Sequence, residues 1–421
     1  MLNRQNLQPQ KLHMKRFLGI VTIGALFGSL NTHAQDAAVT DGSDFEKLPF
    51  KISVDLRSGW DSNVNSASGN VVRDDRGNVV ISDDEIDSAF SAFDITLSKT
   101  FGNLRSYLDL ALSGGMTYYW DAPSDDEDYR LRLDATFRHA VNRRLVLSGN
   151  VGVNYQSEPD YYNSSVVSRG RRSGQYLYAN SRVAANYQWT PKFSTATSYN
   201  LVGVAYEEHE VSHIEDRLEH YLSQEFRFLV LPTTTLVVEY RLGIINYEHF
   251  TDRDSIGHYA LLGADHSFSS KFRGSVRAGV QFRDIDGGGD ETSPHFEGNL
   301  TYAYAPDSTL TWTTRYGLEQ SEIYGPTATN TTFRTGLVVR HGFTAKISGS
   351  LGAYYQNSDY ENEFGNMNYT DDLIDLTASL SYQINRMFSL STGYSYTDQS
   401  SDETFREFKR HRVWAGGTVS F

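Results

Sequence analysis

The apolar side chains of this chain recur at every second position over most of its length. In the stretch KFRGSVRAGVQFR (271–283), Phe272, Val276 and Val280 share one side of an extended strand, and charged or polar residues fill most of the other. The stretch LVVEYRLGI (236–244) follows the same period. Alternation of this kind predicts β-strands with one apolar face, which meets either a protein core or lipid.

The connections between these strands distinguish a core from lipid. We expect eighteen strands, the first over 50–60 and the last over 403–421. Every second connection is very short, such as Gly102-Asn103 and Asn142-Arg143, whereas the alternate connections are long, polar and acidic. Short turns at one end and long loops at the other are typical of a transmembrane barrel. The predicted fold class is therefore all-β, a transmembrane antiparallel up-and-down β-barrel of about eighteen strands, with sixteen as the alternative count.

The N-terminus has the layout of a secretory signal peptide. Two basic residues follow Met14, an apolar run spans 17–30, and Thr32-His33-Ala34 offers a small-residue cleavage site. The alternative is a single membrane anchor, but the apolar run is too short to span a bilayer. The predicted organisation is a signal peptide over 1–35 with translation starting at Met14 and cleavage after Ala34, a short periplasmic segment over 36–49, and the barrel over 50–421.

Charge and cysteine content exclude several classes of function. The leader holds four of the 38 basic residues and no acid, so the mature chain carries 34 basic and 52 acidic residues. No basic domain stands out, and we therefore expect no nucleic-acid partner. The chain has no cysteine, so an exported protein of this kind cannot depend on disulfides. Nothing in the sequence predicts a cofactor.

The stretch HEVSH, from His209 to His213, matches the H-E-x-x-H pattern of zinc proteases. On a helix this spacing places two imidazoles on one face, with Glu210 between them as a base. Acidic residues flank the stretch on both sides, and Glu219 stands where the extended motif has its third histidine. We therefore expect an outward loop, no metal site and no catalytic residues here, so the chain is predicted not to be an enzyme.

Aromatic residues gather near both ends of the expected strands. The set towards the long loops includes Tyr119, Tyr206, Tyr247, Tyr354 and Tyr394. A second set, which includes Trp189, Phe268 and Phe343, lies towards the short turns. Two aromatic girdles are expected where amphipathic rings meet the two lipid–water boundaries.

The last ten residues, RVWAGGTVSF, end on an aromatic side chain. Val413, Ala415, Gly417, Val419 and Phe421 share one face of the final strand. The stretch resembles the terminal strand of Gram-negative outer-membrane barrels, in which the insertion machinery reads a final aromatic residue and alternating apolar residues. This resemblance implies a location in the outer membrane of a Gram-negative bacterium. It also implies the insertion machinery, membrane lipid and lipopolysaccharide as partners.

A second stretch, RSGWDSNVN (57–65), follows directly after the first expected strand. It is similar to the Y/W-D-x-N-V opening of the putative β-barrel porin group. The resemblance covers about 50–421 as an architecture and implies a channel protein of the outer membrane.

The polar strand faces are expected to line the interior, because the apolar faces meet lipid. A barrel of about eighteen strands leaves an aqueous channel, whereas small barrels fill with side chains. Charges on the wall set ion preference, and opposed charges favour hydrated, dipolar solutes. The predicted pore-lining residues are Arg105, Asp109, Arg130, Arg132, Arg138, Glu239, Arg241, Arg273, Arg277 and Arg315.

The third long connection, SEPDYYNSSVVSRGRRSG (157–174), is the one strongly basic loop in an acidic set. In porins the third loop commonly folds into the lumen and narrows it. Arg169, Arg171 and Arg172 are therefore our candidate constriction, and an ordinary surface loop is the alternative.

The function predicted from the sequence is a porin-like channel for passive diffusion of small hydrophilic solutes. Two alternatives stay open. One is a plugged or structural barrel linked to exopolysaccharide export, and the other is an outer-membrane surface enzyme. Residues 36–49 are too few for a plug domain, which favours the open channel. The oligomeric state does not follow from the sequence.

Overall fold

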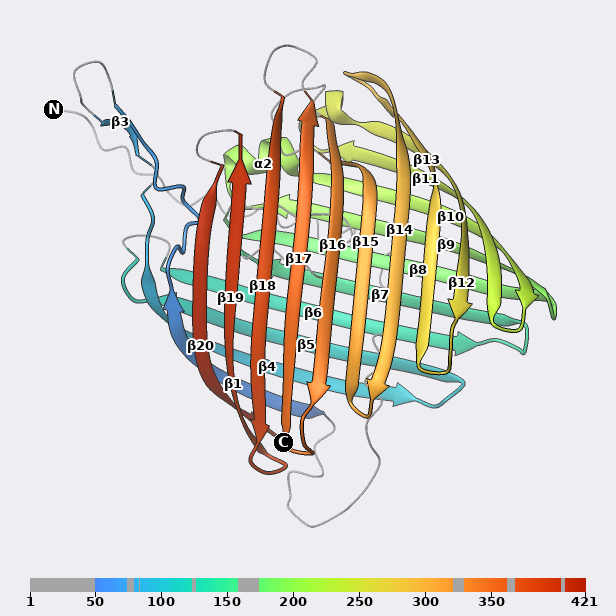
Figure 1. Ribbon diagram of the computed structural model, residues 1–421, viewed down its shortest axis with the longest axis horizontal. Helices are drawn as coiled ribbons and strands as arrows, with labels where there is room; N and C mark the ends of the chain where they lie inside the picture. The colour runs from blue at the N-terminus through green and yellow to red at the C-terminus, as the bar shows by residue number, and fades with distance from the viewer. Residues whose placement is uncertain are drawn as a thin grey trace.

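The computed structural model describes residues 50–73, 79–82, 84–122, 126–157, 174–320, 329–361, 368–402 and 406–421 (Figure 1). The predicted signal peptide, the 36–49 segment and the candidate constriction residues Arg169, Arg171 and Arg172 lie outside these ranges. No helix in the described part of the chain is long and apolar enough to cross a membrane.

Eighteen antiparallel strands form one closed barrel, which confirms the predicted fold class and the higher of the two strand counts. Each strand pairs with its neighbours along the chain, and β1 pairs with both β4 and β20, which closes the ring. The strands are β1 (Lys51–Asp61), β4 (Ser88–Gly102), β5 (Ser106–Tyr119), β6 (Glu127–Ala140), β7 (Leu145–Gln156), β8 (Tyr176–Thr190), β9 (Phe193–Tyr206), β10 (Arg217–Leu231), β11 (Thr234–Tyr247), β12 (Ser255–Ser267), β13 (Phe272–Ile285), β14 (Gly289–Ala305), β15 (Ser308–Gln320), β16 (Thr329–Gly342), β17 (Ile347–Glu361), β18 (Tyr369–Gln383), β19 (Phe388–Ser401) and β20 (Phe408–Ser420).

The apolar face of the sheet is exposed, whereas in a soluble β-sandwich the apolar faces are buried. On β11 the side chains of Leu236, Val238 and Tyr240 are 46%, 44% and 49% exposed. The alternate residues Val237 and Glu239 are only 1% and 5% exposed. A surface that presents leucine, valine and tyrosine outward and buries charged groups inward matches a barrel surrounded by lipid with a polar interior. The period-two pattern of the sequence therefore describes a lipid face and not a core.

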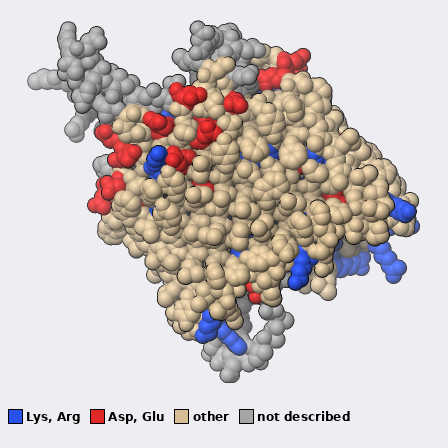
Figure 2. All heavy atoms as spheres, viewed as in Figure 1, with Lys and Arg blue, Asp and Glu red and all other residues tan. Residues whose placement is uncertain are grey.

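The two ends of the barrel differ in structure and in charge. Short turns join the strands at the end that contains the C-terminus, and long connections leave the other end (Figure 1). The long connections hold the hairpin β2–β3 (Val71–Arg73 and Val79–Ser82), the helix α2 (His209–Glu215) and the short helix η2 (Thr251–Arg253). In the view of Figure 2, acidic side chains gather at the long-loop end and basic ones along the short-turn end.

The prediction that HEVSH forms a loop is wrong, because residues 209–215 form the helix α2. The prediction placed the stretch in the outward connection between two strands and used the flanking acids as an argument against a metal site. In the structure, Glu215 pairs with Arg217 at 3.0 Å and with Arg253 at 3.4 Å, so the charge at the end of the helix is compensated.

The predicted outer girdle is wrong at four positions. Tyr119, Tyr206, Tyr247 and Tyr354 are buried and belong to the inward face of their strands. Tyr394 and the short-turn residues Trp189, Phe268 and Phe343 are exposed, as expected for girdle residues. Closeness to a strand end does not decide which face a residue occupies, because one step along a strand reverses the face.

Candidate functional site: the barrel lumen

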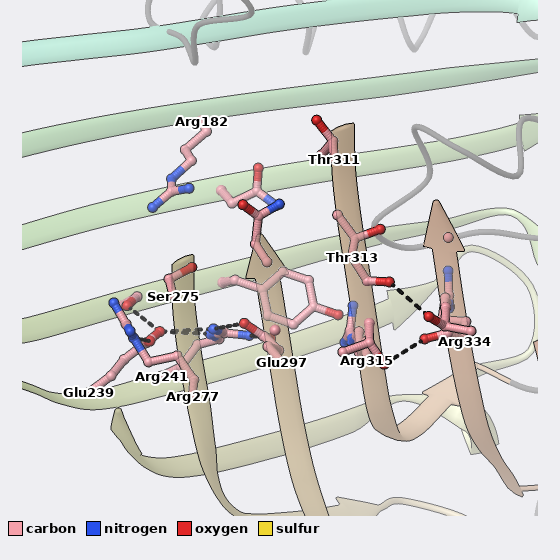
Figure 3. Close-up of a pocket in the computed structure, with 18 of the residues that line it drawn as sticks. Arg182, Glu239, Arg241, Ser275, Arg277, Glu297, Thr311, Thr313, Arg315 and Arg334 are labelled. Carbon is pink, nitrogen blue, oxygen red and sulfur yellow. Dashed lines mark hydrogen bonds and ion pairs between the residues drawn. The ribbon is translucent and has the colours of Figure 1, made fainter. Parts of the chain in front are cut away.

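The interior of the barrel contains a cavity of about 790 Å³ that is lined largely by polar side chains (Figure 3). The lining comes from β7 to β11 on one side and from β13 to β17 on the other. Six arginines and three glutamates contribute to it, together with four asparagines and several threonines and serines. Its charged members are Arg182, Arg241, Arg277, Arg315, Arg334, Arg340, Glu225, Glu239 and Glu297.

Most of these charges are paired along one wall, beginning with Arg241 on β11. Its Nε donates to Glu239 Oε1 at 3.0 Å, and its Nη1 donates to Glu297 Oε1 at 2.9 Å. Glu297 lies on β14, so the second contact passes over β12 and β13 on the inside of the barrel. His295 on the same strand approaches the same carboxylate at 2.8 Å through Nε2. Two carboxylates thus hold one guanidinium at a fixed place on the wall.

The pairing continues on both sides of this group. Arg277 lies 2.9 Å from Asp265 and 3.9 Å from Glu239, and Arg227 also pairs with Asp265. Towards β16, Glu319 pairs with Arg334 and lies 3.7 Å from Arg315. Figure 3 shows the Arg241 and Arg315–Arg334 groups as separate clusters along the same wall. The wall from β10 to β16 therefore carries many charges, of which few are uncompensated.

Arg182 on β8 and Arg340 on β16 differ from the other arginines of the cavity. Neither forms an ion pair with an acidic residue within the described ranges. The contact of Arg182 is a weak donation to Ser198 Oγ at 3.4 Å. Figure 3 shows the Arg182 side chain extending from its strand into the cavity. In the order of the ring β16 is the eighth strand after β8, so the two cations lie on nearly opposite sides of the barrel.

Asparagine side chains surround Arg182 on the wall formed by β7, β8 and β9. Arg182 is directly opposite Asn150 on one neighbouring strand and Asn200 on the other. The Oδ1 atoms of Asn150 and Asn200 are buried and have no hydrogen-bond partner in the described part of the chain. A guanidinium between two carboxamides presents hydrogen-bond donors and acceptors without an opposing carboxylate. This wall is suited to transient contacts with a hydrated solute.

Arg182 was not among the pore-lining residues predicted from the sequence. Its strand, YLYANSRVAANYQWT, alternates weakly because small residues occupy both faces. The register with β9 and the exposed Trp189 at the strand end show which face is inward. Counting back from Trp189 in steps of two identifies the lipid face, and Arg182 is on the other one.

The structure places four of the predicted lining residues in the cavity, namely Glu239, Arg241, Arg277 and Arg315. Five further predicted residues are on the polar face of their strands but do not line it. Arg130 pairs with Asp94 at 3.0 Å and Arg132 with Asp134 at 2.6 Å. The others are Asp109 on β5, Arg138 on β6 and Arg273 on β13.

Arg105 does not belong to the strand wall, contrary to the prediction. It lies in the turn between β4 and β5, where it donates to the backbone carbonyls of Ala140 and Val141 at 2.9 and 2.8 Å. The prediction placed the turn at Gly102-Asn103 and Arg105 on the strand after it, whereas β5 begins at Ser106. The side chain therefore stabilises contact between two neighbouring turns.

The C-terminal motif forms the seam where the barrel closes. Val413, Ala415, Gly417 and Val419 belong to β20, which pairs with β19 and with β1. Phe421 follows the strand, and its backbone N–H donates to Ile52 O at 2.8 Å. The first and last strands of the barrel are thus paired with each other.

A buried charge cluster lies at the outward mouth, between α2 and the lumen. The guanidinium of Arg217 contacts Glu215 at 3.0 Å and Glu219 at 2.8 Å, and all three side chains are buried. At the same junction, Asp216 Oδ1 accepts the backbone N–H of Tyr206 at 2.8 Å. Burial raises the pKa of the Asp216 carboxyl to about 7, although hydrogen bonds from Tyr206 and Ser212 oppose this shift.

The imidazoles of the HEVSH helix are exposed at the outer surface. The ring centres of His209 and His213 are 6.4 Å apart, and His213 stacks on His249 at 5.3 Å. Within the described ranges, no group of three or more histidine, cysteine, aspartate or glutamate side chains is arranged to hold a metal ion.

Comparison with known proteins decides the family. The model of a family described as "Putative beta-barrel porin 2" matches residues 50–421. The chain belongs to this family of porins. The protein resides in the outer membrane of a Gram-negative bacterium. Membrane lipid surrounds it there, and small solutes pass through it. The predicted family and location are therefore confirmed.

The comparison with solved structures gave matches of low sequence identity, among them the outer membrane protein OpdK. OpdK from Pseudomonas aeruginosa is 12% identical, with 88% of this chain and 99% of that chain covered and a TM-score of 0.45. OccAB4 from Acinetobacter baumannii is 13% identical, with 90% and 100% covered and a TM-score of 0.44. The siderophore receptor PirA from Acinetobacter baumannii is 7% identical, with 88% and 80% covered and a TM-score of 0.41. A search of curated proteins found no match.

Proposed function

We propose that this porin is an open channel through which small hydrophilic solutes diffuse passively, without a catalytic step. The observation that carries the proposal is the polar cavity of about 790 Å³ inside an eighteen-stranded barrel. Barrels of sixteen to eighteen strands are wide enough to leave an aqueous path. The paired charges of the β10–β16 wall hold water and orient dipolar solutes across the lumen.

The selectivity that we propose follows from the uncompensated cations. Arg241, Arg277, Arg315 and Arg334 are neutralised by carboxylates, whereas Arg182 and Arg340 are not paired with an acidic residue of the described chain. Free positive charges on opposite sides of the lumen lower the energy of an anion there and raise that of a cation. We therefore propose that small anions pass more easily than cations of the same size.

Two further parts of the proposal concern assembly and the third long loop. The C-terminal strand, with Phe421 at its end, would be the signal that the insertion machinery reads. Arg169, Arg171 and Arg172 would narrow the lumen from the loop between β7 and β8, and their position stays a prediction.

Liposome swelling tests the proposed function directly. Liposomes that contain the refolded mature chain are diluted into isotonic solutions of uncharged sugars of increasing size. We expect rapid swelling for monosaccharides and a steep decline with solute size. A folded barrel that admits no monosaccharide would contradict the proposal and favour the plugged or structural barrel.

A further inference from the structure

Six of the twelve histidines lie on the lipid-facing side of the strands, in two belts. In each ring, Nδ1 is hydrogen-bonded to a hydroxyl of another strand, and His341 Nδ1 contacts two, those of Tyr304 and Ser308. The outer belt consists of His220, His258 and His411, and the inner belt of His139, His266 and His341.

The outer belt repeats one arrangement three times around the barrel. His220, His258 and His411 are each the fourth residue of their strands β10, β12 and β20, counted from the long-loop end. Each contacts a tyrosine hydroxyl of the preceding strand, at 2.7, 2.8 and 2.8 Å. The three tyrosines, Tyr199, Tyr240 and Tyr394, are each the eighth residue from the long-loop end of their strands. Identical depth at three separate places indicates a feature set by the membrane.

The inner belt has its own repeated arrangement near the short turns. His139, His266 and His341 are each the second-last residue of their strands. Each contacts the hydroxyl of the first residue of the preceding strand, which is serine or threonine, at 2.6, 2.8 and 3.1 Å. The strand β12 carries a histidine of each belt.

The separation of the belts places them at the edges of the hydrocarbon layer. His258 and His266 are eight residues apart on β12. At about 3.3 Å per residue this is roughly 26 Å along the strand. A strand tilt of about 40° reduces the height to roughly 20 Å, slightly less than the apolar band of about 25 Å in such barrels. Both belts therefore lie close to the layer of lipid ester and phosphate groups.

Each tyrosine–histidine pair of the outer belt keeps one hydrogen-bond donor that the pair does not use. If the tyrosine O–H donates to Nδ1, the proton of the neutral ring is on Nε2, which is free to donate. If Nδ1 donates to the tyrosine oxygen, the tyrosine O–H is free instead. The side chains of Tyr199, Tyr240, Tyr394, His258 and His411 are exposed on the lipid face. An exposed donor at the hydrocarbon edge needs an acceptor, and lipid phosphates supply the strongest acceptors at that depth.

We propose that the three pairs of the outer belt, Tyr199–His220, Tyr240–His258 and Tyr394–His411, are binding sites for phosphorylated lipid headgroups of the outer leaflet. The occupant is a phosphate monoester or diester of a lipid, which accepts from Nε2–H of each ring and so favours the arrangement in which the tyrosine O–H donates to Nδ1. A protonated ring donates from both nitrogens and binds the same phosphate more tightly. The sites lie on the outside of the barrel and do not depend on whether the lumen conducts.

Native mass spectrometry of the refolded mature chain tests the proposal. The probes are lipid A with two phosphates and the same lipid after removal of its phosphates by a phosphatase. The variant His220→Phe/His258→Phe/His411→Phe keeps three aromatic rings and removes all three imidazoles. We expect up to three phosphorylated lipids on the wild type, and an affinity about tenfold weaker for the variant. The dephosphorylated lipid should bind both proteins equally.

A matched control replaces Tyr316 on β15 and Tyr382 on β18 by phenylalanine, since both are lipid-facing and neither contacts a histidine among the described residues. This control should retain phosphorylated lipid as the wild type does. Equal binding of the phosphorylated lipid to wild type and triple variant would overturn the proposal, as would an equal loss of both lipids.

A second measurement avoids substitutions altogether. In the wild type labelled with ¹⁵N-histidine, phosphorylated lipid A should shift the Nε2 resonances of three rings, and the dephosphorylated lipid should not. If no imidazole responds to the phosphorylated lipid, the proposal is wrong.

Discussion

The two walls of the lumen use arginine in opposite ways. On the β10–β16 wall, Arg241 is held by Glu239 and Glu297. Arg277, Arg315 and Arg334 on this wall also have carboxylate partners, and Arg340 on β16 is the exception. On the β7–β9 wall, Arg182 lies between Asn150 and Asn200 and has no carboxylate partner among the described residues. A paired arginine mainly stabilises the wall, because its field is cancelled over a short distance. An unpaired arginine projects its charge into the path of the solute.

The largest expected difference between the walls is in stability. Replacing Arg241→Gln leaves the carboxylates of Glu239 and Glu297 without their common partner in a partly buried place. We expect a loss of about 1–3 kcal/mol in the free energy of unfolding, measured by urea titration in lipid vesicles. The matched variant Arg182→Gln removes the same charge and should cost less than about 0.5 kcal/mol. Equal losses would remove the distinction between the walls.

For ion selectivity, we expect the larger effect from the β7–β9 wall, where the arginine is unpaired. Arg182→Gln removes an uncompensated charge, so the reversal potential under a salt gradient should move towards cation selectivity. The matched control, Arg132→Gln combined with Asp134→Asn, removes a whole ion pair from another part of the inward face without changing the net charge, so it should move the reversal potential less. The difference should fade near 1 M salt, where the Debye length is about 3 Å. A larger shift for the control would assign selectivity to the β6 side of the barrel.

A smaller effect is expected at the outward mouth, where Asp216 connects α2 to β10. Its pKa is raised to about 7 by burial, from 3.8 in an exposed carboxyl. Between these values the folded state binds the proton more tightly than the unfolded state does, so the local structure gains stability as the pH falls from about 7 towards 4. Glu215 and Glu248 raise the pKa further.

Hydrogen exchange measures this effect in the α2 segment. After correction for the intrinsic rates, protection of the Tyr206 and Ser212 amides should decrease severalfold as the pH rises through 7. Asp216→Asn should show little dependence over the same range. Protection that rises with pH in the wild type would contradict the sign.

The smallest effect is expected for the exposed imidazoles of α2. Replacing His209→Ala and His213→Ala together should leave conductance and ion selectivity unchanged, because both rings lie on the outer surface and away from the cavity. Added zinc should not change the current of either protein. A hydrolytic activity of the wild type that is lost in the double variant would support the alternative hypothesis of an outer-membrane surface enzyme.

The sequence predicted those parts of the structure that depend only on periodicity. The alternation of apolar and polar residues predicted the strands, and the alternation of short turns with long loops predicted the barrel. Together these two patterns placed Glu239, Arg241, Arg277 and Arg315 on the polar face. The partners of these residues could not be predicted in the same way. The contact of Arg241 with Glu297 crosses two intervening strands and depends on their registers.

The failures also have physical reasons. Arg105 was assigned to the barrel wall because the predicted strand began about three residues too early. The strand β5 begins only at Ser106, so Arg105 lies in the turn before it. Arg182 was overlooked because alanine and serine on β8 weaken the contrast between its two faces. The helix α2 was missed because it has only seven residues within the connection between β9 and β10, too few for a helical period to show in the sequence.

Single-channel conductance of the refolded mature chain in a planar bilayer tests the central claim most directly. The account predicts large, steady current steps and a reversal potential that indicates anion preference under a salt gradient. A folded barrel that conducts with cation preference would contradict the role of Arg182 and Arg340, and one without any current would contradict the open channel itself.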